Sequence, residues 1–126
     1  GFKDELCIDW VDFEICDRIY RTGGLFRCVD GIEFSHQLGE RRVSILGRGI
    51  HLRNDVRYYY VIRNAIHLLL REKLSMNFNL LLFLRLCFYI PLYIYVSRSK
   101  KIIIMAISHG LIGRLGLFSR PRIEVD

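Results

Sequence analysis

The sequence predicts an α/β fold that is followed by apolar helices. Residues 1–56 mix short apolar runs with glycine and charged side chains, a pattern typical of a helix that alternates with short extended segments. Residues 57–126 instead contain long apolar runs with helical spacing. A chain of 126 residues is long enough for one small domain, and we divide it into these two parts.

A helix that ends near Thr22 is the first element that the sequence predicts. Asp9 or Asp12 is expected to cap its start, because aspartate side chains accept hydrogen bonds from the free backbone N–H groups there. Gly23–Gly24 follows Thr22 and is expected to stop the helix.

Two short segments without helical spacing come next. Residues 25–39, LFRCVDGIEFSHQLG, are predicted to form a short strand, a turn at Asp30–Gly31 and a second extended stretch. Residues 41–54, RRVSILGRGIHLRN, are expected to form a loop, because Gly47 and Gly49 interrupt them.

A second helix is predicted over residues 57–73, RYYYVIRNAIHLLLREK. Arg63, His67 and Arg71 recur every four residues with Asn64 beside them, and apolar side chains fill much of the rest. This spacing predicts one polar stripe on an otherwise apolar helix.

The run from residue 80 to 96 is nearly long enough to cross a bilayer. Arg85 lies near its middle, which costs roughly 2.5–3.5 kcal/mol on insertion scales, and Pro91 is expected to break the helix. Because both flanks are basic, we expect a kinked helix that lies in the membrane interface rather than a span. The alternative is a helix buried against another part of the protein.

The charge distribution favours a membrane surface over nucleic acid as a partner. Residues 73–123 contain eight lysine and arginine side chains and no acidic one, although they are the most apolar part of the chain. Nucleic-acid modules usually place their basic residues on a polar face. The four cysteines show no CxxC spacing and fit reduced thiols in a cytosolic protein.

Three motifs together resemble a known family. The opening GFKDELCIDWVDFEICDRIYRTGG, with HQLG at residues 36–39, resembles the acceptor half of the GT-A fold in family 2 glycosyltransferases. The stretch YYYVIRNAIHLLLRE and the later ISHGLIGRLG are also similar to that family, and the likeness is strongest to its bacterial rhamnosyltransferase-like branch.

The resemblance implies that residues 1–56 form the acceptor-side, C-terminal portion of a Rossmann-like GT-A domain. Residues 57–126 would then be a helical tail that associates with a membrane. The intact enzyme would move a sugar, such as rhamnose, from a nucleotide-diphosphate donor to a saccharide or lipid-linked acceptor, with inversion. It would work at the cytoplasmic side of the bacterial inner membrane, peripherally, in O-antigen or other surface polysaccharide synthesis. We expect the chain to be a piece of that enzyme and inactive alone.

The family pattern assigns the general base to Asp12. Such a base takes the proton of the acceptor hydroxyl as the oxygen attacks the sugar, and a carboxylate in the first turn of a helix is favoured by the helix dipole. Asp9 and Glu14 are expected to bind the acceptor, and Arg18 to be structural or to face it. The alternative is that Asp9, Asp12 and Glu14 are ordinary acids of a helix start.

His36 is the candidate metal ligand. In metal-dependent members of the family, a histidine at this place helps to hold a divalent ion, Mg²⁺ or Mn²⁺, which neutralises the leaving diphosphate. The other ligands would come from a nucleotide-binding half that does not precede Gly1. A lone histidine before a polar turn is otherwise an ordinary surface or core residue.

Arg63 and Asn64 are further candidates for acceptor binding, together with the neighbouring tyrosines. The alternative is a helix that packs its tyrosines inward and leaves the arginine in solvent. A different class of function also fits the sequence: a small non-enzymatic membrane-associated protein in which the acids are helix caps and the apolar tail is an anchor.

Overall fold

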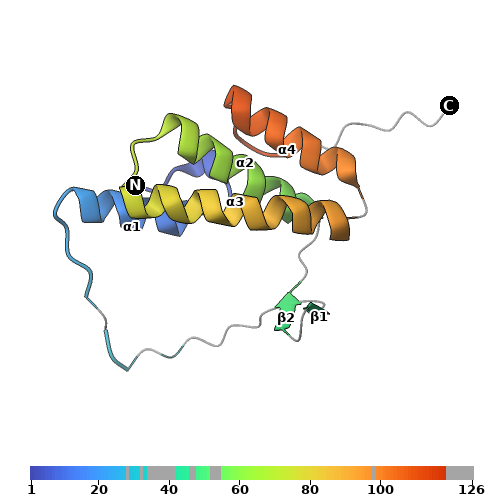
Figure 1. Ribbon diagram of the computed structural model, residues 1–126. Helices are drawn as coiled ribbons and strands as arrows, with labels where there is room; N and C mark the ends of the chain where they lie inside the picture. The colour runs from blue at the N-terminus through green and yellow to red at the C-terminus, as the bar shows by residue number, and fades with distance from the viewer. Residues whose placement is uncertain are drawn as a thin grey trace.

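The computed structural model describes residues 1–27, 29–31, 33, 42–45, 48–51, 55–97 and 99–118, with the backbone alone described at 42–45 and 48–51. Figure 1 shows the order of the elements along the chain. Their bounds are η1, a 3-10 turn at Asp4–Leu6, α1 at Val11–Arg21, β1 at Arg42–Ile45, β2 at Arg48–His51, α2 at Asp55–Arg71, α3 at Met76–Val96 and α4 at Lys100–Ile112.

Helices dominate the described chain, and this corrects the predicted fold class. The sheet within the described residues has two short antiparallel strands, β1 and β2. A Rossmann-like portion requires several parallel strands covered by helices. The prediction of an α/β, GT-A portion is therefore wrong. The prediction concerned residues 1–56, and the described residues there form η1, α1 and the antiparallel β1–β2 pair rather than parallel strands joined by crossover helices.

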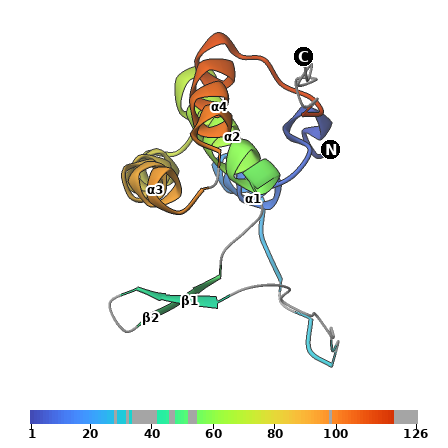
Figure 2. The ribbon, with the colours of Figure 1, turned by 90° about the vertical axis from the view of Figure 1, so that its right-hand side faces the viewer.

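The hairpin occupies a segment that the sequence predicted as a loop. Val43 lies opposite Ile50, and Gly49 lies within β2 opposite Ser44, so this glycine does not interrupt the pairing. Two residues separate the strands, a spacing typical of a tight hairpin. Figure 1 and Figure 2 show the hairpin set apart from the helices.

One prediction for the segment that follows α1 is confirmed. A turn is present at Asp30–Gly31, as predicted. Residues 25–27 form no strand. The second extended stretch, predicted to reach residue 39, lies largely outside the described residues.

The first predicted helix is confirmed as α1, but its start differs from the prediction. Trp10 is the N-cap residue, with φ of 64°, and no side chain caps the helix there. The helix ends before Thr22, and Gly23 follows with φ of 78°, a left-handed conformation that glycine adopts without strain.

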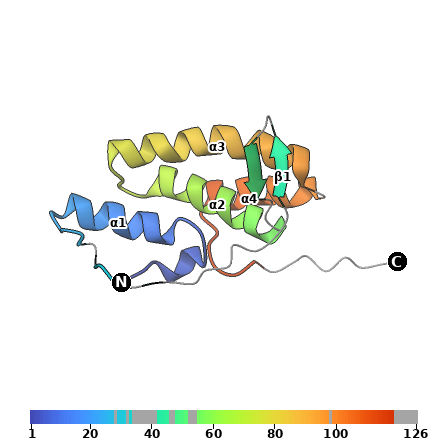
Figure 3. The same ribbon diagram turned by 90° about the horizontal axis from the view of Figure 1, so that it is seen from below.

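The second predicted helix is confirmed as α2, and it forms the centre of the molecule. All eleven residues from Tyr58 to Leu68 are buried, so the helix is covered on every side. It runs between α1 and α3 in Figure 3. Its polar stripe is therefore inside the protein, where each polar group needs a partner.

Helices α3 and α4 pack against α2. Pro91 lies inside α3, which continues to Val96 rather than ending at the proline. Helix α4 approaches α2 closely at Gly110, where an added Cβ would lie 2.8 Å from the Ile66 Cβ. Figure 2 shows α3 at one edge of the helical body, with one side turned away from it.

Candidate functional site

A strained loop at residues 7–10 leads into α1 and carries Asp9. The φ angles of Cys7, Asp9 and Trp10 are 64°, 57° and 64°, a region that residues other than glycine rarely adopt. Such conformations persist only where the surrounding structure holds them, and they cluster at functional sites. This loop also sets where Asp12 stands, one turn further on.

Asn64 of α2 holds this loop by its backbone. Its side-chain amide nitrogen donates to the carbonyl oxygen of Leu6 at 2.8 Å and to that of Ile8 at 2.7 Å. A longer contact of 3.4 Å reaches the carbonyl oxygen of Asp9. Asn64 is fully buried, so these hydrogen bonds replace water for the loop carbonyls.

Arg63 binds the same loop and joins it to the C-terminal segment. Its guanidinium donates to the carbonyl oxygen of Gly116 at 2.6 Å, to that of Leu6 at 3.2 Å and to the Asn64 side-chain oxygen at 2.9 Å. It also lies over the ring of Tyr60, 4.8 Å from the centroid. Its exposed fraction is zero.

These contacts bear on the expectation that Arg63 and Asn64 bind an acceptor. An acceptor cannot reach either side chain while the contacts hold, and the alternative of a solvated arginine does not describe the structure either. Their geometry fits residues that position the loop. The planar guanidinium suits this task, because its fixed fork of donors serves several carbonyl groups at once.

The segment after α4 forms hydrogen bonds with the N-terminal segment and with α2. The Gly116 backbone N–H donates to the carbonyl oxygen of Glu5 at 3.0 Å. The Phe118 backbone N–H donates to the Tyr60 hydroxyl at 2.8 Å. We call residues 113–118 the strap. It ties the beginning of the described chain to its last described residues.

The two candidate aspartates, Asp9 in the loop and Asp12 in the first turn of α1, differ in their surroundings. The Asp9 carboxylate lies 3.4 Å from the Arg57 guanidinium, and its side chain is 10% exposed. Asp12 is exposed on the first turn of α1. Within the part of the chain that the structure describes, no hydrogen bond or ion pair engages its carboxylate. Asp12 is therefore open to a reacting group.

Glu14 lies on the inner side of α1 and is 2% exposed. Its carboxylate oxygens lie 3.8 Å from the Lys3 ammonium and 3.2 Å from the Arg18 guanidinium. Arg18 also donates to the carbonyl oxygen of Gly1 at 2.6 Å. This arrangement gives Glu14 and Arg18 a part in fixing the N-terminal segment, and their predicted contact with an acceptor stays a prediction.

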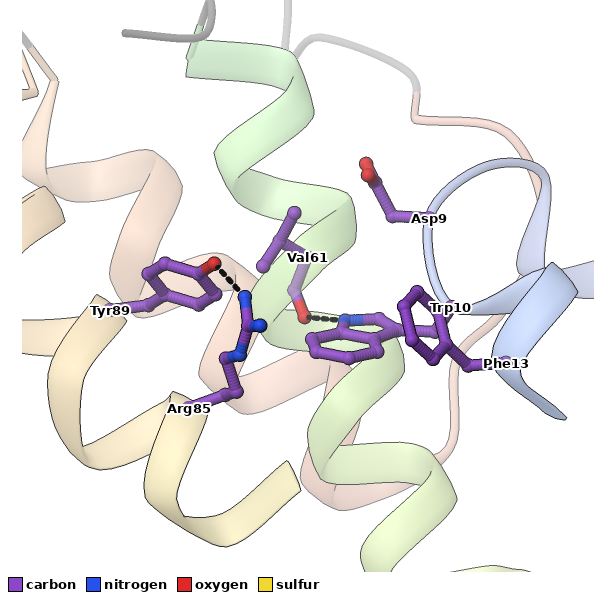
Figure 4. Close-up of a pocket in the computed structure, with 6 residues that line it drawn as sticks. All are labelled: Asp9, Trp10, Phe13, Val61, Arg85 and Tyr89. Carbon is purple, nitrogen blue, oxygen red and sulfur yellow. Dashed lines mark hydrogen bonds between the residues drawn. The ribbon is translucent and has the colours of Figure 1, made fainter. Parts of the chain in front are cut away.

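A small pocket opens beside Asp9, where the N-terminal segment meets α2 and α3. Its volume is about 80 Å³, and its lining combines aromatic rings with one carboxylate and one guanidinium. Figure 4 shows Arg85 and Tyr89 reaching from α3 toward Trp10 and Phe13. The lining residues are Asp9, Trp10, Phe13, Val61, Arg85 and Tyr89.

Hydrogen bonds hold three of the side chains in this pocket. The Trp10 indole N–H donates to the carbonyl oxygen of Val61 at 2.9 Å, and the Arg85 guanidinium donates to the Tyr89 hydroxyl at 2.6 Å. The sequence reading treated Arg85 only as a charge that interrupts an apolar run. Its spacing of four residues from Tyr89 on one helix is the signal that pairs them.

The predicted metal site is not tested by the structure. His36 lies outside the described residues. Among the residues that are described, no group of three or more His, Cys, Asp or Glu side chains is placed to hold a metal ion. The described part of the site therefore consists of Asp12, Asp9 with its pocket, and the residues that hold the loop.

The fold and site define a helical segment with an exposed carboxylate at a helix start, beside a small aromatic and charged pocket. No protein-family model and no solved structure matches the chain. The chain is similar to a curated enzyme, the dTDP-rhamnosyl transferase RfbF of Shigella flexneri, with 42% identity over 69 residues. This similarity supports a rhamnosyltransferase-like relationship.

The match is partial on both sides. It covers 55% of this chain and 23% of the relative. The chain thus corresponds to less than a quarter of the length of the transferase that it matches.

Proposed function

We propose that this chain is the acceptor-side segment of a family 2 glycosyltransferase that moves rhamnose from dTDP-rhamnose to a saccharide or lipid-linked acceptor. The observation that carries the proposal is the similarity to the dTDP-rhamnosyl transferase of Shigella flexneri. The exposed carboxylate of Asp12, at the end of a loop held by buried side chains, supports it. The segment alone is expected to be inactive.

The proposed reaction is a single displacement. The acceptor hydroxyl oxygen forms a bond to the anomeric carbon as the bond from that carbon to the diphosphate oxygen breaks. The hydroxyl proton passes to the Asp12 carboxylate, and the nucleotide diphosphate leaves. A positioned base of this kind is typically worth ~10²–10⁴ in rate. Attack from the side opposite the leaving group inverts the anomeric carbon.

We further propose that the pocket beside Asp9 receives the acceptor sugar. The Asp9 carboxylate accepts hydrogen bonds from sugar hydroxyl groups, and the Arg85 guanidinium donates to them. The Phe13 ring, which is 54% exposed, offers an apolar surface to one face of the sugar. The pocket therefore offers both polar groups and aromatic surface to a sugar.

A divalent metal, Mg²⁺ or Mn²⁺, remains part of the proposal for the complete enzyme. When bound, it would neutralise charge on the leaving diphosphate. His36 is the residue of this chain that would contribute to its site, and the other ligands would come from outside the chain. The proposed setting is bacterial surface polysaccharide synthesis, such as that of O-antigen, at the cytoplasmic side of the inner membrane.

The experiment is a transfer assay with the complete protein that contains this segment. It is supplied with dTDP-rhamnose, saccharide acceptors and lipid-linked acceptors. Asp12→Asn is expected to lower turnover by ~10²–10⁴ with donor binding little changed. Asp4→Asn is the matched control, because Asp4 is also exposed and lies outside α1. Near-normal turnover in Asp12→Asn would remove this residue from the role of base. Transfer of a different sugar would correct the donor, and no transfer at all would favour a non-enzymatic membrane-associated protein.

A further inference from the structure

Helix α3 has two apolar sides, and one of them has no protein cover in the described structure. The inner side buries Phe78, Leu82, Leu86 and Tyr93 against the rest of the molecule. We call the other side the outer face of α3. Its large side chains, each 42–87% exposed, are Met76, Leu80, Phe83, Leu84, Phe88, Ile94 and Tyr95. A contiguous exposed apolar surface of this kind marks an interaction site.

Helix α3 is long and apolar enough to cross a membrane by length and composition. Its attachments indicate a different orientation. At its start, the backbone N–H of Ser75 donates to the Asp17 carboxylate at 3.1 Å. At its end, the Ser97 hydroxyl donates to the Asp55 carboxylate at 2.9 Å. Both ends are therefore tied to the same helical body.

The attachments at the two ends of α3 disfavour an orientation in which this helix crosses a bilayer. A spanning helix has its two ends in opposite aqueous phases, so crossing would break one of these attachments or draw a carboxylate and its helix into the hydrocarbon. The inner side is also packed along its length, from Phe78 to Tyr93, against a body whose centre is α2. Unpaired polar groups in hydrocarbon are costly. A helix that lies flat keeps both attachments.

The basic residues beside the outer face favour a membrane surface that contains anionic lipid. Lys73 precedes α3, and Lys100 and Lys101 begin α4 just beyond it, all three exposed. Arg85 is exposed midway along α3. The sequence has no acidic side chain from residue 73 to 123. Basic residues around an apolar face are attracted to a surface of anionic lipid.

We propose that the outer face of α3 docks on an anionic lipid bilayer, with the helix parallel to the membrane plane. The apolar side chains enter the boundary between head groups and acyl chains, and the lysines contact the lipid head groups. Helices α2 and α4 remain on the water side. This proposal does not depend on the transferase activity, and it applies to the chain whatever reaction the complete protein performs.

The first test is co-sedimentation of the full chain with vesicles. Phosphatidylcholine vesicles that also contain phosphatidylglycerol are expected to bind at least about ten-fold more strongly than phosphatidylcholine alone, and high salt is expected to reduce the difference. The double variant Lys100→Gln and Lys101→Gln should lose most of this preference. Absence of binding to the anionic vesicles would overturn the proposal.

The second test addresses the apolar face itself. Phe83→Ser with Phe88→Ser is expected to lower binding by at least about ten-fold, because two large apolar side chains no longer enter the boundary. Both residues are more than half exposed, so the fold should tolerate the change. Leu25→Ser is the matched control, since Leu25 is 87% exposed and lies outside α3. Unchanged binding in the double variant would show that another surface is responsible. A stable dimer in solution that this variant dissolves would make a second copy of the chain the occupant.

The third test fixes the orientation. In a cysteine-free background, Asn77→Cys and Lys101→Cys place single thiols beyond the two ends of the apolar stretch. A membrane-impermeant maleimide added outside the vesicles should label both. Labelling of only one of them, with the other protected until the vesicle is opened, would show that α3 spans the bilayer and that the proposal is wrong.

Discussion

The side chain of Asn64 and the backbone of Leu6 lie 2.8 Å apart, joined by a hydrogen bond across 58 positions of the chain. This bond, with its partner to Ile8, fixes the loop that carries Asp9 and precedes Asp12. The buried Asn64 of α2 therefore positions the loop from which α1 begins. Substitutions at buried positions of α2 should consequently alter the positions of Asp9 and Asp12.

The first prediction tests this link with Asn64→Asp. The new carboxylate keeps the acceptor for Arg63 but replaces the amide nitrogen and its two N–H donors with one oxygen atom, which faces the carbonyl groups of Leu6 and Ile8. We expect the free energy of unfolding to fall by at least about 2 kcal/mol, because buried acceptors lose their donors and a charge is buried. Urea unfolding measures the change.

Asn77→Asp is the control for that substitution. Asn77 is exposed in the first turn of α3, where a negative charge is favoured by the helix dipole. Its effect should lie within about 0.5 kcal/mol of the wild type. Equal effects of the two variants would mean that the hydrogen bonds of Asn64 do not stabilise the loop.

The second prediction concerns the close approach of α4 to α2 at Gly110. A Cβ there would lie 2.8 Å from the Ile66 Cβ and 2.9 Å from the Arg63 carbonyl oxygen. Alanine in a helix interior is favoured over glycine by about 1 kcal/mol, whereas overpacking costs about 1–3 kcal/mol. Because the contact involves a backbone oxygen that cannot swing away, we expect Gly110→Ala to be destabilising.

The melting temperature of Gly110→Ala, compared with that of Ser108→Ala, checks this sign. Ser108 is exposed on the same helix, so its replacement adds helix propensity without a clash. A Gly110→Ala protein that melts at a higher temperature than the wild type would contradict the packing at this position.

The third prediction is a loss of stability at mildly acidic pH. Burial lowers the pKa of His67 below its ordinary value of 6.5, the nearby Glu72 opposes this, and Arg71 adds to it. The folded chain therefore binds fewer protons than the unfolded chain. The stability that the neutral imidazole provides is present above pH 6.5 and is lost as the pH falls through the lowered pKa.

Thermal unfolding at about pH 7.5 and about pH 5.5 measures this loss. The melting temperature of the wild type should fall with pH, and that of His67→Gln should fall less. Burial also lowers the pKa of His109. The melting temperature of His67→Gln should therefore still fall somewhat with pH, and that of the double variant with His109→Gln should fall less. A wild type whose stability does not change over this range would refute the prediction.

The fourth prediction separates two aspartates of one helix. Burial by itself raises the pKa of Asp17, but the hydrogen bonds from Ser75 and Arg21 outweigh it and lower this pKa below 3.8. Asp17→Asn weakens these charged hydrogen bonds and should cost about 1–3 kcal/mol of unfolding free energy. Asp12→Asn should change it by less than about 0.5 kcal/mol, because Asp12 is exposed.

Urea unfolding of both variants tests this contrast, and combined with the transfer assay it separates stability from catalysis. We expect Asp17→Asn to be the less stable protein and Asp12→Asn to be the less active enzyme. A large loss of stability in Asp12→Asn would assign that carboxylate to the fold, as an ordinary acid of a helix start.

Local patterns in the sequence predicted the helices well. The helix at 57–73 was predicted because apolar residues recur with its period, and α2 covers most of that range. Gly23–Gly24 correctly marked the end of α1. These features depend on residues within a few positions of one another, which is the range over which periodicity and end signals act.

Tertiary contacts explain what the sequence did not predict. Arg63 and Asn64 were predicted to bind an acceptor, because nothing nearby in sequence supplies the carbonyl groups that they bind in the structure. Trp10 stands at the N-cap position in place of the predicted Asp9 or Asp12, because the loop is held from α2 and not by its own side chains. The fold class rested on the short extended segments predicted in residues 1–56 and on the family resemblance, but residues 25–27 form no strand and the described sheet is a two-stranded hairpin.

The position of the strap in the sequence affects the order in which contacts form during synthesis and folding. Residues 1–10 are synthesised before their partners, because the partners in α2 follow more than fifty positions later and Gly116 follows more than a hundred positions after Glu5. Contacts of such long sequence separation form late in folding, because a long loop must close before they are gained. During synthesis, the N-terminal segment therefore lacks a complete set of partners until α2 and the strap have left the ribosome. A nascent chain that stops at Ile112 would still hold the loop through Asn64, but it would lack the bonds of Gly116 to Arg63 and Glu5.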